Sequence, residues 1–407
     1  MHQEILKRRY VIKAIINEGV RPVELAHPEN NSSHPLSYME LPFDPEYTLY
    51  NNRMTPEFLN NVSPDEQYWA VRRSVVFRNT GELPIEISGP DAERFANYVF
   101  TRQISKFKPG RCSYQFACLR DGGMITDGVM LHLERNKLWM AQADGELLKW
   151  YLAHSNGFDV TIIDPNIWVS QIQGPKSMDV LAEVIDGEFP RRWNYFDIAH
   201  VSISGEPVII TRTGFSNELG WEIYLQPKND CEAIGDKIWK VGKKYNMVLG
   251  GTPAFRARRI EAGLLSAGAD FDQKTTPYEV GLGRFVDLGK ENFLGKSCLQ
   301  IADKTNKLWG FKVSQGIAQK GDLFSRHGDI IGKVTSSTWS PFLNCGVGIT
   351  RVKDNSLSAG SVISVLGIDG KEYGGELCKL PMYDKKGLIV RGKNIIVPTK
   401  PKPWILN

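Results

Sequence analysis

The alternation of apolar and polar positions divides the chain into two regions of different character. Between residues 70 and 285, short apolar runs alternate with amphipathic stretches. This pattern predicts strands at 137–142, 160–163, 201–213 and 221–225, and helices at 145–154, 230–245 and 253–267. After about residue 305, short apolar runs such as "IIGKVTSSTW" and "CGVGITRV" are separated by Gly, Ser and Asp. We therefore expect a mixed α/β core followed by a small antiparallel barrel or sandwich.

Two stretches of the α/β region repeat one pattern. "ISGPDAERFANYVF" begins at Ile87, and "IQGPKSMDVLAEVI" begins at Ile172. Each reads as a strand end, a glycine turn, a proline at the first helical position and an amphipathic helix, because the missing N–H of proline is unpaired there in any case. Apolar residues follow at helical spacing, such as Phe95 and Val99 in the first copy. The repeat predicts two related α/β units.

The first 60 residues show no clear period. Residues 24–60 are rich in Pro, Asn, Ser and aromatic residues, which predicts an irregular but packed segment. The amphipathic N-terminus carries charges throughout and lacks the apolar centre of a secretory signal, so we expect a cytoplasmic protein. The predicted division is an N-terminal segment at 1–60, an α/β core of two units at 61–300 and a barrel domain at 305–400.

Composition excludes several classes of protein. The 407 residues are 24% charged and 42% hydrophobic, as in an ordinary soluble globular protein, and the net charge of +4 is too small to favour nucleic acid. No apolar run approaches the length of a membrane span. The six cysteines form no C-x-x-C pair and the seven histidines no metal-binding spacing, so no metal is expected. We expect a small-molecule partner.

Two acidic residues interrupt apolar strand patterns. Asp127 lies in "RDGGMITDGVM", where a double-glycine turn leads into a strand, and Glu222 lies in "GWEIYL". Aspartate is depleted in strands, and such local violations are expected more often at functional or strained sites. Glu261, in the helix "RARRIEAGLL", is predicted to be structural and paired with Arg258 or Arg259. No nucleotide-binding glycine motif and no G-x-S-x-G elbow is present.

An ordered set of motifs from about residue 65 to residue 385 resembles the glycine-cleavage T-protein superfamily. The set includes "ISGPDAERF", "CSYQFACLRDGGMITDGVML", "IQGPKSMDVL", "TRTGFSNELGWEIYL", "TTPYEVGLGRFV" and "LPMYDK". "YTLYNNRMTPEF" and "LWMAQADGELLKW" look like the dimethylsulfoniopropionate demethylase branch, and "NRMTPEF" and "QIQGPK" also resemble the aromatic O-demethylase branch. The resemblance implies a three-domain, ring-like α/β (α+β) fold, with two related α/β units, a C-terminal antiparallel β-barrel and folate in the central channel.

The same resemblance assigns roles to individual residues. Asp127 matches the catalytic aspartate, and Glu222 matches the glutamate that binds the pterin. The folate-bordering positions fall on Tyr114, Trp139, Ala141 and Phe215. Phe255 stands in place of the family's arginine for the folate tail, so Arg256 or Arg258 is expected to replace it. Tyr50 and Arg78 are expected to contact the methyl donor.

The implied cofactor is tetrahydrofolate, and the implied activity is methyl transfer from a small methylated donor to N5 of that cofactor. A carboxylate accepts both adjacent donors of a pterin edge, which suits Glu222. A carboxylate at Asp127 suits a cationic donor, so a sulfonium such as dimethylsulfoniopropionate is favoured. Thr126 replaces the first acid of the family motif, which argues against the plain T-protein reaction. Three alternatives stay open, as does a homodimer: an aminomethyltransferase of the glycine-cleavage type, a demethylase of N-methyl amines or aromatic ethers, and a non-catalytic folate-binding protein.

Overall fold

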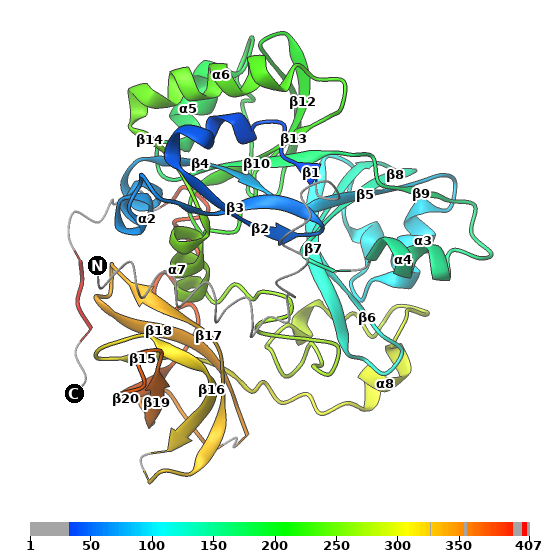
Figure 1. Ribbon diagram of the computed structural model, residues 1–407. Helices are drawn as coiled ribbons and strands as arrows, with labels where there is room; N and C mark the ends of the chain where they lie inside the picture. The colour runs from blue at the N-terminus through cyan, green and yellow to red at the C-terminus, as the bar shows by residue number, and fades with distance from the viewer. Residues whose placement is uncertain (1–31, 146, 326, 354–355, 394–400, 405–407) are drawn as a thin grey trace.

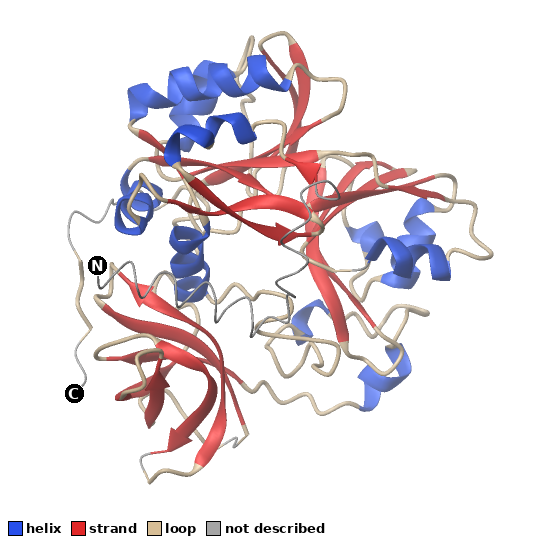
Figure 2. Ribbon diagram, in the orientation of Figure 1, coloured by secondary structure: helices blue, strands red, loops and turns tan. Residues whose placement is uncertain are grey.

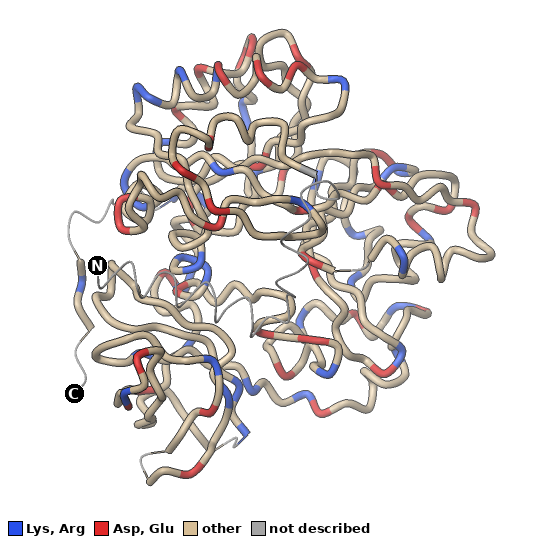
Figure 3. The backbone as a smooth tube through the Cα atoms, in the orientation of Figure 1, with Lys and Arg blue, Asp and Glu red and all other residues tan. Residues whose placement is uncertain are grey.

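Three structured parts surround the centre of the molecule (Figure 1). The computed structural model describes residues 32–145, 147–325, 327–353, 356–393 and 401–404, so the amphipathic N-terminus lies outside the described residues. Two parts are α/β units, each with helices against a sheet, and the third is an all-β barrel (Figure 2). Acidic and basic residues are interspersed over all three parts (Figure 3). None of the helices in the described ranges combines the length and apolar character needed to traverse a lipid bilayer.

The segment expected to be irregular contains a regular β-hairpin. Strand β2 (Pro45–Tyr50) pairs antiparallel with β3 (Arg53–Leu59), and the short β1 (Ser32–Ser33) lies beside β3. The two turn residues, Asn51 and Asn52, have φ values of 54° and 58°. Asparagine tolerates this left-handed conformation and favours two-residue hairpin turns. The Asn-Asn pair was therefore a hairpin signal within a segment rich in proline.

A five-stranded sheet forms the first α/β unit. Its strands, in the order in which they lie, are β6 (Arg111–Cys118), β7 (Met124–Glu134), β8 (Lys137–Gln142), β5 (Leu83–Ser88) and β9 (Thr161–Ile163). Helices α3 (Ala92–Val99) and α4 (Leu147–His154) share one apolar core with Met130 and Met140 of this sheet. The predicted strand at 137–142 and the helix predicted at 145–154 are confirmed within a few residues.

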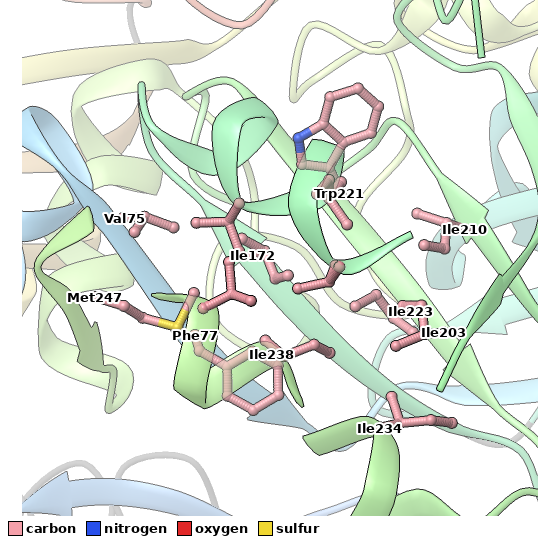
Figure 4. Packing of buried hydrophobic residues seen from close by; sticks show 14 of the residues in the cluster. Val75, Phe77, Ile172, Ile203, Ile210, Trp221, Ile223, Ile234, Ile238 and Met247 are labelled. Atoms are coloured by element: carbon pink, nitrogen blue, oxygen red, sulfur yellow. The ribbon is translucent and has the colours of Figure 1, made fainter. Parts of the chain in front are cut away.

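A six-stranded sheet forms the second unit. Its order is β11 (Ile198–Ile203), β12 (Glu206–Thr211), β13 (Gly220–Leu225), β10 (Trp168–Gln173), β4 (Val75–Thr80) and β14 (Met247–Leu249). Helices α5 (Ser177–Val184) and α6 (Cys231–Gly242) cover one face. The core beneath them is apolar (Figure 4); it includes Val75, Phe77, Ile172, Ile210, Trp221, Ile223, Ile234, Ile238 and Met247.

Two sequence predictions in this unit had the wrong length. The single strand predicted at 201–213 is a hairpin, because Ser204 and Gly205 both adopt positive φ and turn the chain between β11 and β12. The helix predicted at 253–267 is α7 (Thr252–Ala262), which ends where Gly263 adopts φ 73°. A glycine in this conformation commonly terminates a helix.

The repeated strand–glycine–helix pattern is confirmed in both units. Gly89 follows β5 with φ 122°, and Gly174 follows β10 with φ 131°. An added Cβ would lie 2.6 Å from a backbone oxygen in each case, that of Asp159 or that of Ser74, so both turns require glycine. The prolines lie in the turns rather than at the first helical position, since α3 begins at Ala92 and α5 at Ser177.

The C-terminal region forms the predicted antiparallel barrel. Six strands close in the order β15 (Leu308–Val313), β18 (Cys345–Val352), β17 (Ile330–Ser340), β16 (Ala318–Ser325), β19 (Val362–Gly367) and β20 (Glu372–Cys378). Helix α7 contacts β17 and β18, and it also contacts α2 (Pro64–Arg73). Together α2 and α7 therefore connect the barrel to the six-stranded unit (Figure 1).

Candidate functional site

The two sheets present complementary faces to each other. On β7, Asp127, Val129 and Leu131 alternate onto one face, and the register places Val129 opposite Ala141 and Leu131 opposite Trp139. These apolar residues join Val169, Ile209 and Tyr224 of the six-stranded sheet in one buried cluster. The rings of Trp139 and Tyr224 are 6.2 Å apart. Trp139 and Ala141, the two residues of β8 predicted to bind folate, therefore line the junction between the two units.

Asp127 is buried and hydrogen-bonded at this junction. The Tyr114 hydroxyl donates to Oδ2 of Asp127 at 2.6 Å, and the Asp127 side chain is only 7% exposed. Burial raises the pKa of Asp127 to about 6, although the bond from Tyr114 opposes that shift by favouring the carboxylate. The Tyr114 ring in turn lies 5.2 Å from that of Phe285. Tyr114 and Asp127, both predicted as site residues, are therefore in direct contact.

The two residues next to Asp127 also depart from an ordinary strand pattern, and the structure gives a reason for each. Gly128 pairs closely with β8, and a Cβ added to it would lie 2.2 Å from the backbone oxygen of Ala141. Thr126 points to the opposite face, where its hydroxyl donates to the backbone oxygen of Asp144 at 2.8 Å. Thr126 is therefore directed away from the Asp127 face rather than standing beside it as a second acid.

Glu222 belongs to a polar row that crosses four strands of the second unit. Direct pairing places Thr211, Glu222, Gln171 and Arg78 side by side across β12, β13, β10 and β4. Gln171 donates to Oε1 of Glu222 at 3.0 Å, and the Thr213 hydroxyl donates to Oε2. Burial, followed by the nearby charge of Glu82, raises the pKa of Glu222 to about 7. The row faces the five-stranded sheet, because Val169, Ile209 and Tyr224 share its face.

Arg78 and Tyr50 connect this row to Asp127. Arg78 donates to the Thr252 hydroxyl at 3.0 Å, and its guanidinium lies 4.8 Å from the centre of the Phe255 ring. Burial holds the pKa of Tyr50 well above its ordinary value, and the charges of Glu82 and Asp127 act in the same direction. Tyr50 also acts electrostatically on Arg78. Tyr50 therefore interacts electrostatically with Asp127 and with Arg78.

The remaining predicted residues have different surroundings. Arg256 forms an ion pair with Glu57 of β3 at 3.3 Å, and burial lowers the pKa of Arg256 to about 9. Arg258 is completely buried and paired with Glu218 and Glu261, so it is not available to a folate tail. Phe215 lies, partly exposed, in the loop between β12 and β13.

The structural role predicted for Glu261 is confirmed through its pairing with Arg258. Arg259, the other partner considered for Glu261, instead pairs with Asp270 at 2.7 Å.

Sequence reasoning missed three polar residues of the site. Gln171 opens "QIQGPK", which was interpreted only as a family resemblance, yet strand alternation places it on the same face as Val169. Glu82 has a buried carboxylate oxygen that lacks a hydrogen-bond partner among the described residues. Asn51 carried a turn signal but no functional one. Only the strand register reveals which side chains become neighbours, and a single sequence does not supply it.

Comparison with known families identifies the class of protein. Residues 41–290 match the GCVT N-terminal domain, and residues 306–384 match the glycine cleavage T-protein C-terminal barrel domain. The chain therefore belongs to the glycine cleavage T-protein family, whose members include folate-dependent aminomethyl- and methyltransferases and demethylases. This membership confirms the resemblance drawn from the ordered motifs.

Individual relatives differ in activity. An aminomethyltransferase of Clostridium botulinum (strain Okra / Type B1) is 31% identical over 292 residues, covering 69% of this chain and 78% of the relative. The dimethylsulfoniopropionate demethylase DmdA of Ruegeria pomeroyi is 29% identical over 338 residues, covering 80% and 90%. A trimethylamine-oxide aldolase of the same organism is 31% identical over 355 residues, covering 81% of this chain but 44% of the relative.

A solved structure supports the fold. The aminomethyltransferase T of the glycine cleavage system from Bartonella henselae superimposes with a TM-score of 0.78. The superposition covers 87% of this chain and 98% of that chain, at 21% sequence identity. The ring of two α/β units and a barrel is therefore the T-protein fold.

Proposed function

We propose that this protein is a tetrahydrofolate-dependent methyltransferase that demethylates a small methylated donor and passes the methyl group to N5 of the folate. The observation that carries this proposal is the arrangement of two buried carboxylates, Asp127 and Glu222, on facing sheets whose shared cluster includes Trp139 and Tyr224. Family members use tetrahydrofolate, so a folate-sized ligand between these sheets is the natural occupant.

Glu222 has the chemistry needed to hold a pterin. Its two oxygens are fixed by Gln171 and Thr213, which leaves lone pairs for the adjacent N–H donors of a pterin edge. Oε1 of Gln171 is buried without a hydrogen-bond partner among the described residues, and the Tyr224 hydroxyl is buried beside Thr211. Such groups in the immediate surroundings of Glu222 fit a flat, polar ligand. Trp139 would border that ligand. Its indole N–H donates to Glu86 at 2.8 Å, which fixes the orientation of the ring.

Asp127 would act by positioning charge rather than by strong acid–base chemistry. In the proposed step, the N5 lone pair attacks the methyl carbon, and the electrons of the broken bond leave with the sulfur or other heteroatom. A carboxylate stabilises a cationic donor beside N5, and holding two reactants in line is itself a large rate contribution. The N5 proton then passes to a carboxylate or to water. The Tyr114 bond keeps the Asp127 oxygens oriented for this role.

A sulfonium donor is favoured over the other methylated compounds. The DmdA relative is covered over 90% of its length, and Arg78 supplies a positive charge suited to a carboxylate on the donor. Tyr50 and Arg78 are the proposed donor contacts, and Arg256 is the proposed contact of the folate tail. The predictions of a homodimer and of a cytoplasmic location accompany this proposal.

Product analysis tests the proposal. Purified protein is incubated with tetrahydrofolate and each of a panel of donors: a sulfonium, an N-methyl amine, an aromatic methyl ether and the aminomethylated carrier of glycine cleavage. Formation of 5-methyl-tetrahydrofolate with the sulfonium supports the proposal. Formation of 5,10-methylene-tetrahydrofolate would indicate an aminomethyltransferase or an amine demethylase. Folate binding without turnover of any donor would indicate a binding protein.

A further inference from the structure

The turn of the β2–β3 hairpin is attached to both α/β units through one asparagine. The Asn51 side-chain amide donates to the backbone oxygen of Gly81 at 3.0 Å and to that of Gln142 at 3.4 Å. Its side-chain oxygen accepts from the Gln142 amide at 2.9 Å and from the backbone N–H of Gly145 at 3.2 Å. The backbone N–H of Asn51 donates to Asp144 at 2.9 Å. All polar atoms of this side chain are therefore used.

The fit between the hairpin and the chain after β4 leaves no room for adjustment. A Cβ added to Gly81 would lie 2.7 Å from Cγ2 of Thr55 and 2.9 Å from the backbone oxygen of Tyr50. Gly81 does not have positive φ, so close approach rather than backbone conformation is what requires glycine here. The hairpin turn thus packs directly against Gly81, which lies in the connection between β4 and β5.

The loop that receives Asn51 is itself attached to the catalytic strand. The backbone N–H of Ala143 donates to the backbone oxygen of Asp127 at 2.8 Å, and the Thr126 hydroxyl donates to that of Asp144 at 2.8 Å. Residues 143–145 therefore connect β7 to the hairpin turn; we call them the clip. The Tyr50 hydroxyl is hydrogen-bonded to the backbone of Asp144, within the same clip.

We propose that Asn51 is a positioning residue that holds Tyr50 beside Asp127 through the clip, and that it thereby sets the affinity for the methyl donor. Its predicted effect on the donor rests on the proposed function. Thr126 gains a role as well, because the residue that replaces an acid of the family motif supports the clip from the other side. Asn51 acts through Tyr50, whereas Glu222 and Trp139 lie on the sheet faces where folate is placed.

Asn52 offers a matched control for Asn51. Both residues adopt left-handed φ, 54° and 58°, in the same turn, but Asn52 is exposed whereas Asn51 is partly buried. Glycine tolerates this conformation, so Asn51→Gly and Asn52→Gly both preserve the turn while removing one side chain. A comparison of the two variants separates the loss of the clip contacts from any effect on the hairpin itself.

We expect Asn51→Gly to raise KM for the donor about tenfold or more, since all four hydrogen bonds of one partly buried side chain are lost. The Kd for tetrahydrofolate should stay within about twofold of wild type, and Asn52→Gly should match wild type in both quantities. An unchanged donor KM in Asn51→Gly would overturn the proposal. Equal losses of donor and folate affinity would also overturn it, because they would show a general structural role.

A second measurement does not depend on turnover. Amide hydrogen exchange at Gly145 should speed up at least about tenfold in Asn51→Gly and stay unchanged in Asn52→Gly, because the Gly145 N–H loses its acceptor. If no donor reacts with the wild-type protein but the exchange result holds, the proposed function fails and the clip stands. If the exchange rate at Gly145 is unchanged in Asn51→Gly, Asn51 does not hold the clip, and the proposal is wrong whatever the activity.

Discussion

Asp127 illustrates a conflict between stability and function at the scale of a single residue. Methyl transfer as proposed needs its carboxylate, yet burial penalises the charged form and raises the pKa to about 6 from an ordinary value of 3.8. The folded protein therefore binds this proton more tightly than the unfolded chain does. Proton binding at Asp127 therefore adds to the free energy of unfolding. This contribution is fully present below about pH 4 and is lost as the pH rises through about 6.

At pH 7.5, Asp127→Asn should unfold with a free energy about 1–3 kcal/mol higher than that of wild type, because a buried charge is removed. The same variant should lose methyl transfer at least about 100-fold. Denaturant unfolding at pH 4 and pH 7.5 measures the first effect, and product formation measures the second. Asp322→Asn, at an exposed position on β16, should change neither quantity. A fully active Asp127→Asn protein would refute the proposed mechanism.

Glu222 gives a prediction about folate affinity. Glu222→Gln should weaken tetrahydrofolate binding about 10- to 100-fold, because an amide supplies one acceptor where the carboxylate supplies two. Equilibrium titration measures the Kd. Glu134→Gln is the control, since Glu134 is exposed at the end of β7. Wild-type affinity in Glu222→Gln would place the pterin elsewhere.

At the scale of an element, the pairing of β7 with β8 sets the direction of Asp127. Gly128 has the backbone of β8 so close that any side chain must separate the two strands. We predict that Gly128→Ala lowers the free energy of unfolding by at least about 2 kcal/mol and also lowers methyl transfer, since Asp127 is the adjacent residue.

The control for Gly128→Ala is another glycine of a strand. Gly374 in β20 has no atom within 4 Å of an added Cβ, so Gly374→Ala should be nearly neutral in stability. Thermal unfolding of both variants tests the pair of expectations. Similar losses in the two variants would show that the effect belongs to strand glycines in general and not to the close approach of β8.

Elements were predicted well where one local signal dominated. The run 137–142 is bounded on both sides by polar or turn residues, and β8 has those bounds. The run 201–213 was mistaken for one strand, because the Ser204–Gly205 turn signal inside a long apolar run was overlooked. The site itself was predicted in part. The register that brings Gln171 beside Glu222, and the seating of Asn51 on Gly81, depend on contacts between distant parts of the chain.

At the scale of the whole molecule, buried charges connect the barrel to the α/β units. Glu261 of α7 accepts from Tyr68 of α2 at 2.8 Å and from Ser340 of β17 at 2.6 Å, and it also pairs with Arg258 and with the Tyr383 hydroxyl. Glu261 is 1% exposed and Arg258 is completely buried. Such a network is weak evidence for added stability, but breaking it leaves an uncompensated charge.

Glu261→Gln should therefore be strongly destabilising. We expect a loss of about 3–5 kcal/mol in the free energy of unfolding, together with a lower Tm, because Arg258 loses a charged partner inside the protein. Asp179→Asn removes one partner of an exposed ion pair with Lys176 and should cost no more than about 1 kcal/mol. Denaturant unfolding compares the two variants, and equal effects would contradict the distinction between buried and exposed pairs.

The place of β4 in the second sheet has a consequence for protein synthesis. Residues 75–80 leave the ribosome early, yet their two partner strands are β10 at 168–173 and β14 at 247–249, with the whole five-stranded sheet translated in between. At about 5–20 residues per second, β4 waits several seconds for its first neighbour and longer for its second. During that interval the backbone N–H and C=O groups along both edges of β4 are unpaired and open to wrong pairing, so this early segment is one that a chaperone would protect.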